Sequence, residues 1–295
     1  MKQKLKLLFL GLVLIQLSSA ENDPEVSIVP FTVSKNGQII ITACINNTDL
    51  PARFYIETNG RNLLRSDQPD QLKYFCINTG DENTEIDSLA IGICHFLNCS
   101  FRIANRLENR GEYAFPDSVL GTLGPELFED KILQIDYAQK VIRISTLLSA
   151  LNIPDSAFRV EFKEDRKTAG INLELQTSDF GSHDVAVDTR SPLGIHLYYS
   201  DLSASQRKKN DDKFKHSAVK LDGYNNKTFV YYEQEIMSLD KIIQINNQPV
   251  WFSDFVPNSI GNAFLNQFRI TIDFKEHMLY LEPITDKGIH MISPL

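Results

Sequence analysis

The sequence predicts a mostly β protein of two lobes that repeat one unit about a pseudo-twofold axis. Eighteen Phe and ten Tyr stand against four Met and one Trp, a composition that favours strands over helical bundles. Short segments of alternating apolar and polar residues recur along the chain, and a stretch around residue 136 returns around residue 273. At 295 residues the chain is long enough for two lobes, each with its own core.

The clearest repeat is a segment with one glycine followed by a hairpin. A shift of 273 − 136 = 137 residues superimposes its two copies without a gap, so that Gly124 coincides with Gly261 and Asp136 with Asp273. The apolar positions coincide as well. The matched segments are 123–128 with 260–265, 133–137 with 270–274, and 141–144 with 278–281.

Each copy predicts a local structure. The two later segments alternate as half-buried strands joined by a polar turn, and the first forms one or two helical turns after its glycine. We expect Gly124 and Gly261 to lie where a Cβ would clash or where φ is positive. Asp136 and Asp273 resemble a pair of acids, but we expect them to cap the hairpin turns, where Asp is common.

The beginning of each half also repeats. Residues 38–45 and 170–175 predict strands, and each is followed by an apolar strand that ends in an acid and a threonine. The first of these strands ends in Glu57 and Thr58, and the second ends in Asp188 and Thr189. The acids are 188 − 57 = 131 residues apart, so the two halves differ in length by about six residues.

This order of elements resembles the pepsin and retropepsin superfamily of aspartic proteases. In that superfamily each lobe has an apolar strand ending in Asp-Thr-Gly and a later segment of two apolar residues and glycine. The chain is most similar to bacterial two-lobed retropepsin-like proteins, through residues 28–31 (IVPF) and 260–265 (IGNAFL). The resemblance covers about residues 27–284 and implies lobes at 21–150 and 151–295.

The resemblance also implies the residues of a catalytic site. Glu57 and Asp188 occupy the positions of the two acids, which in the superfamily share one water and one proton. Thr58 and Thr189 match residues that brace the two loops against each other. Gly124 and Gly261 match its structural glycines. The chemistry needs no metal or other cofactor.

Both motifs are degenerate. Glu57 stands where the superfamily has Asp, and its extra methylene moves the carboxylate by about one C–C bond, an error that can cost on the order of a hundredfold in rate. Asn59 and Arg190 replace the two motif glycines. We expect Arg190 to block close approach of the backbone and to hold Asp188 ionised by pairing with it.

Two functions stay open on these residues. The protein either binds an extended peptide or another protein in the inter-lobe cleft with lost or much reduced peptidase activity, or it is an aspartic endopeptidase that uses Glu57 and Asp188. The altered motifs favour the first function. The acid retained at both positions favours the second.

The first twenty residues predict a cleaved signal peptide. Three lysines precede an apolar run at residues 7–17, which is too short to span a bilayer comfortably, and small residues follow at 18–20. We therefore expect an exported protein, periplasmic or secreted. Removing residues 1–20 changes the formal charge from −8 to 27 − 38 = −11, which argues against nucleic acid or anionic membrane as a partner.

Four cysteines, Cys44, Cys76, Cys94 and Cys99, lie in the first half. In an oxidising compartment an even number suggests at least one disulfide, and four cysteines allow three connectivities. We favour Cys94–Cys99 closing a small loop, with Cys44 bonded to Cys76. A zinc site built from Cys94, His95 and Cys99 is the alternative, although its spacing matches no standard zinc finger.

Overall fold

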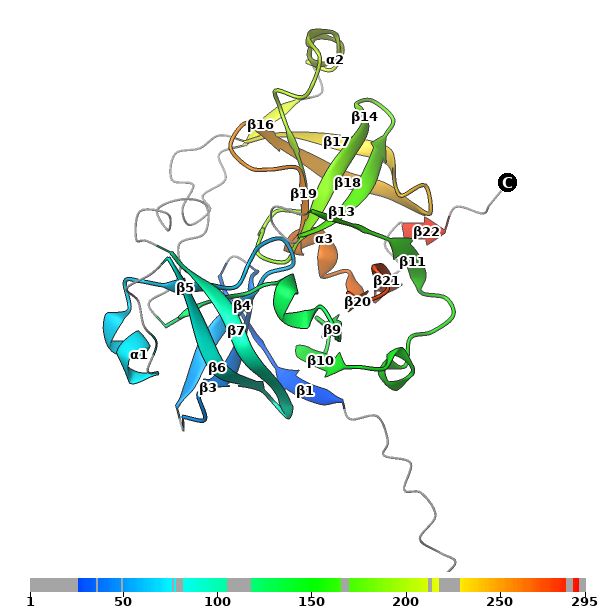
Figure 1. The fold of residues 1–295 in the computed structure, drawn as a ribbon. Helices are drawn as coiled ribbons and strands as arrows, with labels where there is room; N and C mark the ends of the chain where they lie inside the picture. Colours follow the sequence, from blue (N-terminus) through cyan, green and yellow to red (C-terminus); the bar gives the residue numbers. More distant parts are fainter. Residues whose placement is uncertain are drawn as a thin grey trace, which may run out of the picture.

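The computed structural model describes residues 26–291 except 36, 49, 76, 78–81, 105–117, 166–169, 212–213, 218–228 and 285–288. The chain is mostly strand and is arranged as two lobes joined by a shared sheet; in Figure 1 the N-terminal lobe lies at the lower left, the C-terminal lobe at the top and most of the shared strands at the right. This agrees with the mostly β, two-lobed fold that the sequence predicts. The predicted signal peptide at residues 1–20 lies outside the described residues.

The shared sheet has six strands, three from each half of the chain. All neighbours along it are antiparallel. Its inner strands β9 and β20 are buried on both faces, so the polar residues that alternate with their apolar ones are almost all buried as well. In order across the sheet, the strands are β1 (Ser27–Pro30), β10 (Val141–Ser145), β9 (Ile132–Asp136), β20 (Phe268–Asp273), β21 (Met278–Pro283) and β11 (Phe158–Glu161).

The register of β9 against β20 places the pseudo-twofold axis in this sheet. Gln134 lies opposite Thr271, which is its own equivalent 137 residues later in the repeat. The Gln134 amide donates to the Thr271 hydroxyl at 2.9 Å, and both side chains are buried. The repeat read from the sequence is therefore the symmetry of the fold.

The N-terminal lobe is built on a seven-stranded sheet that closes on itself through the additional pairing of β3 with β6. The short helix α1 (Pro69–Tyr74) follows β5 along the chain. In order across the sheet, the strands are β2 (Thr32–Val33), β3 (Ile39–Ile45), β4 (Pro51–Ile56), β8 (Gly121–Leu123), β5 (Leu63–Arg65), β7 (Cys94–Ala104) and β6 (Asn83–Ile91).

The C-terminal lobe is built on a nine-stranded sheet, and the helix α2 (Ala204–Lys209) lies at its outer end (Figure 1). In order, its strands are β12 (Lys163–Asp165), β13 (Gly170–Thr177), β14 (Gly181–Asp188), β19 (Ser259–Gly261), β15 (Ile195–Tyr198), β18 (Ile243–Ser253), β17 (Phe229–Leu239) and β16 (Lys215–Ser217), with β22 (Ile289–Met291) paired to β18.

One supersecondary unit occurs in both lobes. The strand that ends at the predicted acid runs parallel to a short glycine-containing strand, β4 with β8 and β14 with β19. The short strand also pairs antiparallel with the strand that follows the acid, β5 or β15. The predicted helical turns come next, as a 3-10 helix at Pro125–Phe128 and as α3 (Asn262–Leu265).

The hairpin turns are capped as predicted. The Asp136 carboxylate accepts a hydrogen bond from the Gln139 backbone N–H at 2.9 Å, and Asp273 accepts one from the Glu276 N–H at 3.1 Å. These two acids therefore stabilise the turns.

The predicted Cys94–Cys99 disulfide is wrong. Both residues lie on the extended strand β7, so their Cα atoms are about 16 Å apart, far beyond the reach of a disulfide. The same extension separates two ligands of the alternative zinc site. The described cysteines Cys44, Cys94 and Cys99 form no disulfide with one another. Cys76, and with it the predicted Cys44–Cys76 bond, lies outside the described residues.

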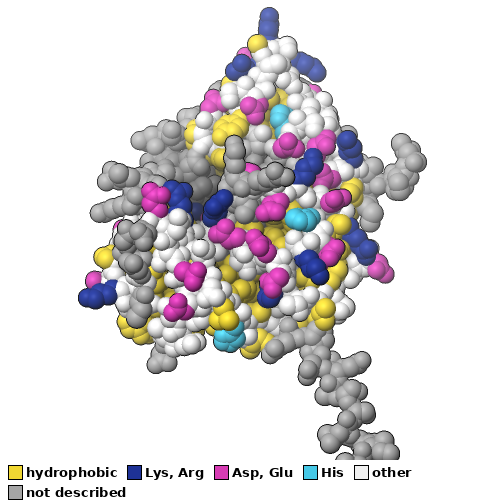
Figure 2. All heavy atoms as spheres, in the orientation of Figure 1, with side chains coloured by type: hydrophobic (Ala, Val, Ile, Leu, Met, Phe, Trp, Pro, Cys, Tyr) yellow, Lys and Arg dark blue, Asp and Glu magenta, His cyan; other side chains and the backbone are white. Residues whose placement is uncertain are grey.

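None of the helices in the described part of the chain is both long and apolar enough to cross a membrane. On the face seen in Figure 2, acidic and basic side chains are interspersed over both lobes.

Close backbone contact explains the two repeat glycines. A Cβ at Gly124 would lie 2.3 Å from the Gly60 carbonyl oxygen, and one at Gly261 would lie 2.5 Å from the Leu193 carbonyl oxygen. Their φ angles are −92° and −110°, so a left-handed backbone is not the reason. Each glycine lets the loop that follows the predicted acid pack directly onto the short central strand.

We expect Gly261→Ala to lower the free energy of unfolding by roughly 1–3 kcal/mol, because backbone atoms cannot move aside as a side chain can. Gly194→Ala is the matched control, since a Cβ there would meet nothing closer than 3.9 Å. Its effect should stay within about 1 kcal/mol. Urea unfolding of the two variants measures both values, and equal destabilisation would contradict the packing account.

Candidate active site

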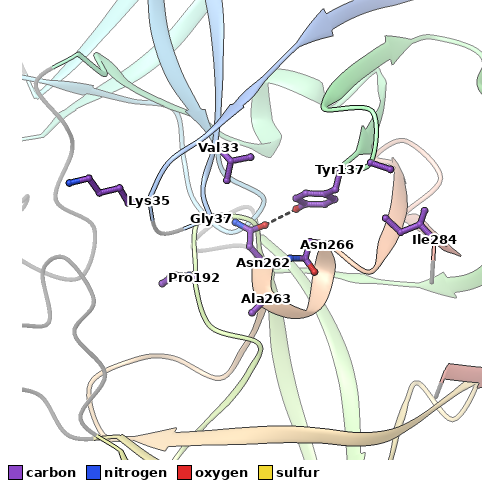
Figure 3. A pocket seen from close by; sticks show the side chains of 10 residues that line it. Val33, Lys35, Gly37, Tyr137, Pro192, Asn262, Ala263, Asn266 and Ile284 are labelled. Carbon is purple, nitrogen blue, oxygen red and sulfur yellow. Dashed lines mark hydrogen bonds between the residues drawn. The ribbon is translucent and has the colours of Figure 1, made fainter. Parts of the chain in front are cut away.

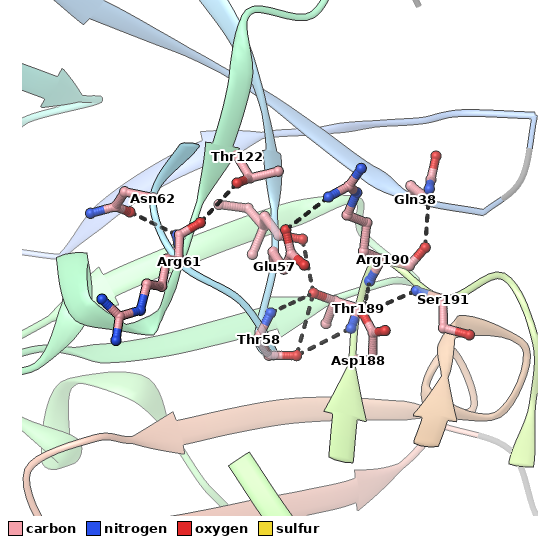
Figure 4. A network of polar contacts seen from close by, with 12 residues as sticks. Gln38, Glu57, Thr58, Arg61, Asn62, Thr122, Asp188, Thr189, Arg190 and Ser191 are labelled. Atoms are coloured by element: carbon pink, nitrogen blue, oxygen red, sulfur yellow. Dashed lines mark hydrogen bonds and ion pairs between the residues drawn. The ribbon is translucent and has the colours of Figure 1, made fainter. Parts of the chain in front are cut away.

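Two equivalent loops meet where the lobes join. The first follows β4 and begins at Glu57, whose backbone N–H donates to the Leu123 carbonyl at 3.0 Å. The second begins at Asp188, the last residue of β14, which lies opposite Gly261. Each predicted acid is therefore held at the end of a strand in the core of its own lobe (Figure 4).

Thr58 and Thr189 join the loops through a reciprocal set of hydrogen bonds. The Thr58 hydroxyl donates to the Val187 carbonyl at 2.6 Å and accepts from the Thr189 N–H at 3.1 Å. The Thr189 hydroxyl donates to the Ile56 carbonyl at 2.8 Å and accepts from the Thr58 N–H at 3.2 Å. Both threonines are buried, so every bond is shielded from water.

Asp188 is oriented by its own loop. One oxygen, Oδ1, accepts hydrogen bonds from the backbone N–H groups of Arg190 at 2.8 Å and Ser191 at 3.1 Å. The residue is only 5% exposed. Replacement of the motif glycine by Arg190 therefore leaves the backbone support of this carboxylate intact.

Glu57 folds back over Gly60. A Cβ built on Gly60 would lie 2.4 Å from the Glu57 Oε1 atom, so the carboxylate occupies space that only glycine leaves open. Asn59 stands at the motif glycine, directly after Thr58. The next residue, Gly60, is the one that the Glu57 side chain approaches closely. The extra methylene of glutamate is thus accommodated by the adjacent loop.

The Arg190 side chain crosses between the two loops. Its Nη1 atom lies 3.1 Å from the Glu57 Oε2 atom, and the two side chains are 9% and 12% exposed. Its guanidinium also lies over the ring of Tyr55, 5.7 Å from the ring centroid. The Arg190 carbonyl accepts a hydrogen bond from the Gln38 amide at 3.0 Å. Arg190 is therefore fixed at both its backbone and its charged end.

The pairing of Arg190 with Glu57 was not predicted from the sequence, and the predicted pairing of Arg190 with Asp188 stays a prediction. The ion pair in the structure joins Arg190 to Glu57, 133 residues away. The physical reason is geometric: the Arg190 N–H already bonds Asp188, and its long side chain extends from there toward the opposite loop. The longer side chain of glutamate meets it.

Three charges therefore gather at one buried place. Burial raises the pKa of the Glu57 carboxyl, the Arg190 guanidinium opposes this by lowering it, and the neighbouring Asp188 raises it again, so that the net pKa lies above its usual value. In a proton-sharing dyad, repulsion between two carboxylates is relieved by one proton. Here a guanidinium occupies the place beside Glu57 and relieves part of that repulsion by its own charge.

Gln38 and Tyr55 belong to this site but no motif in the sequence marks them. Gln38 immediately precedes β3 and Tyr55 lies within β4, and each is an ordinary residue for its position. They reach Arg190 only because the fold brings residues more than 130 positions apart into contact. A list of local motifs could not have found them.

A second close pair of reactive residue types, His196 and Ser253, lies in the C-terminal lobe. The His196 Nε2 atom is 2.8 Å from the Ser253 hydroxyl and its Nδ1 atom is 3.1 Å from the Pro257 carbonyl. A carbonyl can only accept, so Nδ1 carries the proton and Nε2 accepts from the serine. Burial lowers the pKa of His196 to about 4. With His196 fully buried and no acid on its ring, the pair satisfies core polar groups.

The chain was compared with known proteins. No protein-family model matches the sequence, and no curated protein matches it. Its fold is similar to that of the aspartic proteinase from Irpex lacteus, with a TM-score of 0.55 and 11% identity over 90% of this chain and 100% of that one. It is also similar to basic 7S globulin from soybean, with a TM-score of 0.54 and 9% identity over 88% and 95% of the two chains. At such identities the likeness shows the fold alone: this chain has the pepsin-like fold of an aspartic proteinase.

Proposed function

We propose that this protein binds an extended peptide or protein segment between its lobes and has lost most or all peptidase activity. In this proposal it is a relative of the bacterial retropepsin-like proteins with degenerate motifs. The observation that carries the proposal is the buried ion pair between Arg190 and Glu57, with 3.1 Å between the charged atoms.

The ion pair opposes catalysis in two ways. Attack on a peptide bond requires a water held between two carboxyl groups, one of them protonated and the other ionised. The Arg190 guanidinium is bonded to Glu57, so this carboxyl group is not available to hold the water. It also favours the ionised form of that group, against the sharing of a proton with Asp188.

The support for binding is the part of the site that has been kept. The reciprocal bonds of Thr58 and Thr189 hold the two loops in register across the lobes. The glycine contacts at Gly124 and Gly261 hold each loop against its own lobe. A solved neighbour of the fold is an aspartic proteinase, a protein whose substrates are peptide chains.

An active endopeptidase is the second candidate function. It is favoured by the retained acid at both positions and by the two backbone N–H groups that orient Asp188. Its dyad would be Glu57 and Asp188, and Arg190 would have to leave Glu57 when substrate binds.

Export to the periplasm or secretion is part of the proposal. Its support is the basic, apolar and small-residue pattern of residues 1–20. Peptides from outside the cytoplasm are then the partners to test.

Incubation with a mixed peptide library from acidic to neutral pH tests activity and binding together. We expect mass spectrometry to find peptides retained on the protein and no new cleavage products, because Glu57 is paired with Arg190. Asp188→Asn is the control variant and should retain the same peptides. Robust cleavage that disappears in Asp188→Asn would instead establish the endopeptidase.

Restoring both motifs tests whether the loss of activity comes from the loops. The triple variant Glu57→Asp, Asn59→Gly, Arg190→Gly should cleave peptides at acidic pH, on the order of a hundredfold faster than any single variant. A single change should do little, since Arg190→Gly leaves Glu57 buried without its cation and Glu57→Asp leaves Arg190 without its partner. A folded triple variant without activity would remove the main support for a peptide cleft and favour a scaffold role.

A further inference from the structure

The turn that joins β2 to β3 lies beside the second loop of the site. Its chain folds back on itself: the Ser34 backbone N–H donates to the Gln38 carbonyl at 2.9 Å, and the Gly37 N–H donates to the Ser34 carbonyl at 3.1 Å. Gly37 has a φ of +81°, in the left-handed region that favours glycine. On the outer side, Val33 and Gly37 border a pocket of about 720 Å³, and Lys35 extends away from it (Figure 3). Ser34 and Gln38 are bonded instead toward the site.

A chain of hydrogen bonds runs from this turn to Arg190. The Gln38 amide donates to the Arg190 carbonyl at 3.0 Å (Figure 4), and its oxygen accepts from the Ser34 hydroxyl at 3.1 Å. Gln38 is only 3% exposed, so its amide would be costly to bury with either end unbonded. The Ser34 side chain is also hydrogen-bonded to the Tyr55 hydroxyl. Because the amide oxygen of Gln38 can only accept, Ser34 donates to it and Tyr55 donates to Ser34.

Tyr55 brings this chain back to Arg190. The Arg190 guanidinium lies over the Tyr55 ring, 5.7 Å from its centroid, and the Arg190 Nη1 atom is 3.1 Å from the Glu57 Oε2 atom. Arg190 is thus held through its carbonyl and through the face of its guanidinium, and Ser34 joins the two contacts into a closed ring. We call Ser34, Gln38 and Tyr55 the arginine clamp. A long side chain has many rotamers, and this ring of contacts selects one that meets Glu57.

The pseudo-twofold axis supplies an internal comparison for the clamp. Since 190 − 59 = 131 and 186 − 55 = 131, the equivalent of Arg190 is Asn59 and the equivalent of Tyr55 is Ala186. The equivalent pair has neither the ring nor the long cationic side chain. Ring and arginine therefore occur together, which favours a role for Tyr55 in holding Arg190 over a role in packing alone.

We propose that Ser34, Gln38 and Tyr55 are positioning residues that hold the Arg190 side chain on Glu57. The proposal rests on the proposed function, which attributes the loss of peptidase activity to this ion pair. It adds that the ion pair is maintained by a turn of the N-terminal lobe, outside both acid-threonine motifs.

The charges around the clamp give the direction of its effect. Arg190 and Asp188 are the charged groups that act on Glu57, and Arg190 lowers the pKa of Glu57 whereas Asp188 raises it. A looser Arg190 should therefore raise the pKa of Glu57. The cations that act on Tyr55 are Arg190, Arg53 and Arg65.

The test is an NMR titration of the Glu57 carboxyl carbon in three variants of the clamp. Ser34→Ala removes the bridge, Gln38→Met removes the bond to the Arg190 carbonyl, and Tyr55→Phe keeps the ring and removes only its hydroxyl. We expect Glu57 to titrate at a higher pH in each variant than in the native protein, and at no higher pH than in Arg190→Met, which lacks the guanidinium.

Ser27→Ala is the matched control. The Ser27 hydroxyl also makes two hydrogen bonds, donating to the Ile91 carbonyl at 2.8 Å and accepting from the Ile93 N–H at 3.1 Å. Its loss should lower the free energy of unfolding and leave the titration of Glu57 as it is in the native protein. A shift in Ser27→Ala equal to that in Ser34→Ala would mean that any loss of stability moves Glu57, and would overturn the proposal.

A double variant tests whether the clamp acts through Arg190. Adding Ser34→Ala to Arg190→Met should move the titration of Glu57 no further, because no guanidinium is left to hold. A shift of the same size with and without Arg190 would overturn the proposal. So would an unchanged titration in Ser34→Ala, Gln38→Met and Tyr55→Phe.

The titration needs no peptide, so the two proposals can fail separately. If the native protein cleaves the peptide library while the clamp variants shift Glu57, the clamp stands and the proposed loss of activity fails. If peptides are retained uncut and the clamp variants leave Glu57 unshifted, the proposed function stands and the clamp fails.

Discussion

The site depends on the hydrogen bonds that Thr58 and Thr189 exchange across the lobes. Each hydroxyl bonds both the N–H of the other threonine and the carbonyl two residues before it, so neither loop can shift alone. Buried polar groups of this kind are costly to break because water cannot replace their partners. These hydrogen bonds fix the distance between the two loops. The other side chains of the loops must therefore pair across that fixed distance. Arg190 and Glu57 do so.

A buried cation is stable only when its surroundings compensate its charge. Arg190 is paired with Glu57, packed over the Tyr55 ring and bonded through its carbonyl by Gln38. Gly60 leaves the room into which the longer side chain of Glu57 folds. Removing one partner of such a pair strands the other charge, so departures at two motifs that look independent in sequence function together in the fold. The site is rebuilt around a charge pair, and this is why reversing one change alone cannot restore a dyad.

The sequence predicted the symmetric framework because that framework repeats locally. The alternation around Asp136 and Asp273 and the glycines at 124 and 261 are visible in short windows, and the structure places Gln134 opposite its equivalent Thr271. The one wrong prediction concerns two residues of an extended strand, and the contacts that no local pattern predicted join residues far apart in the sequence. Cys94 and Cys99 are close in sequence but far apart on an extended strand. The ion pair of Arg190 with Glu57 joins residues 133 positions apart, and Gln38 and Tyr55, which contact Arg190, carry no local signal.

The central claim is that the Arg190 guanidinium, rather than a shared proton, compensates the charge of Glu57. The most direct measurement is an NMR titration of the Glu57 carboxyl carbon in the native protein and in Arg190→Met, which keeps the length of the side chain without its charge. Arg190 lowers the pKa of Glu57 against the effects of burial and of Asp188. The account therefore predicts that the pKa of Glu57 is higher in the variant than in the native protein. An unchanged pKa in a correctly folded Arg190→Met protein would contradict it.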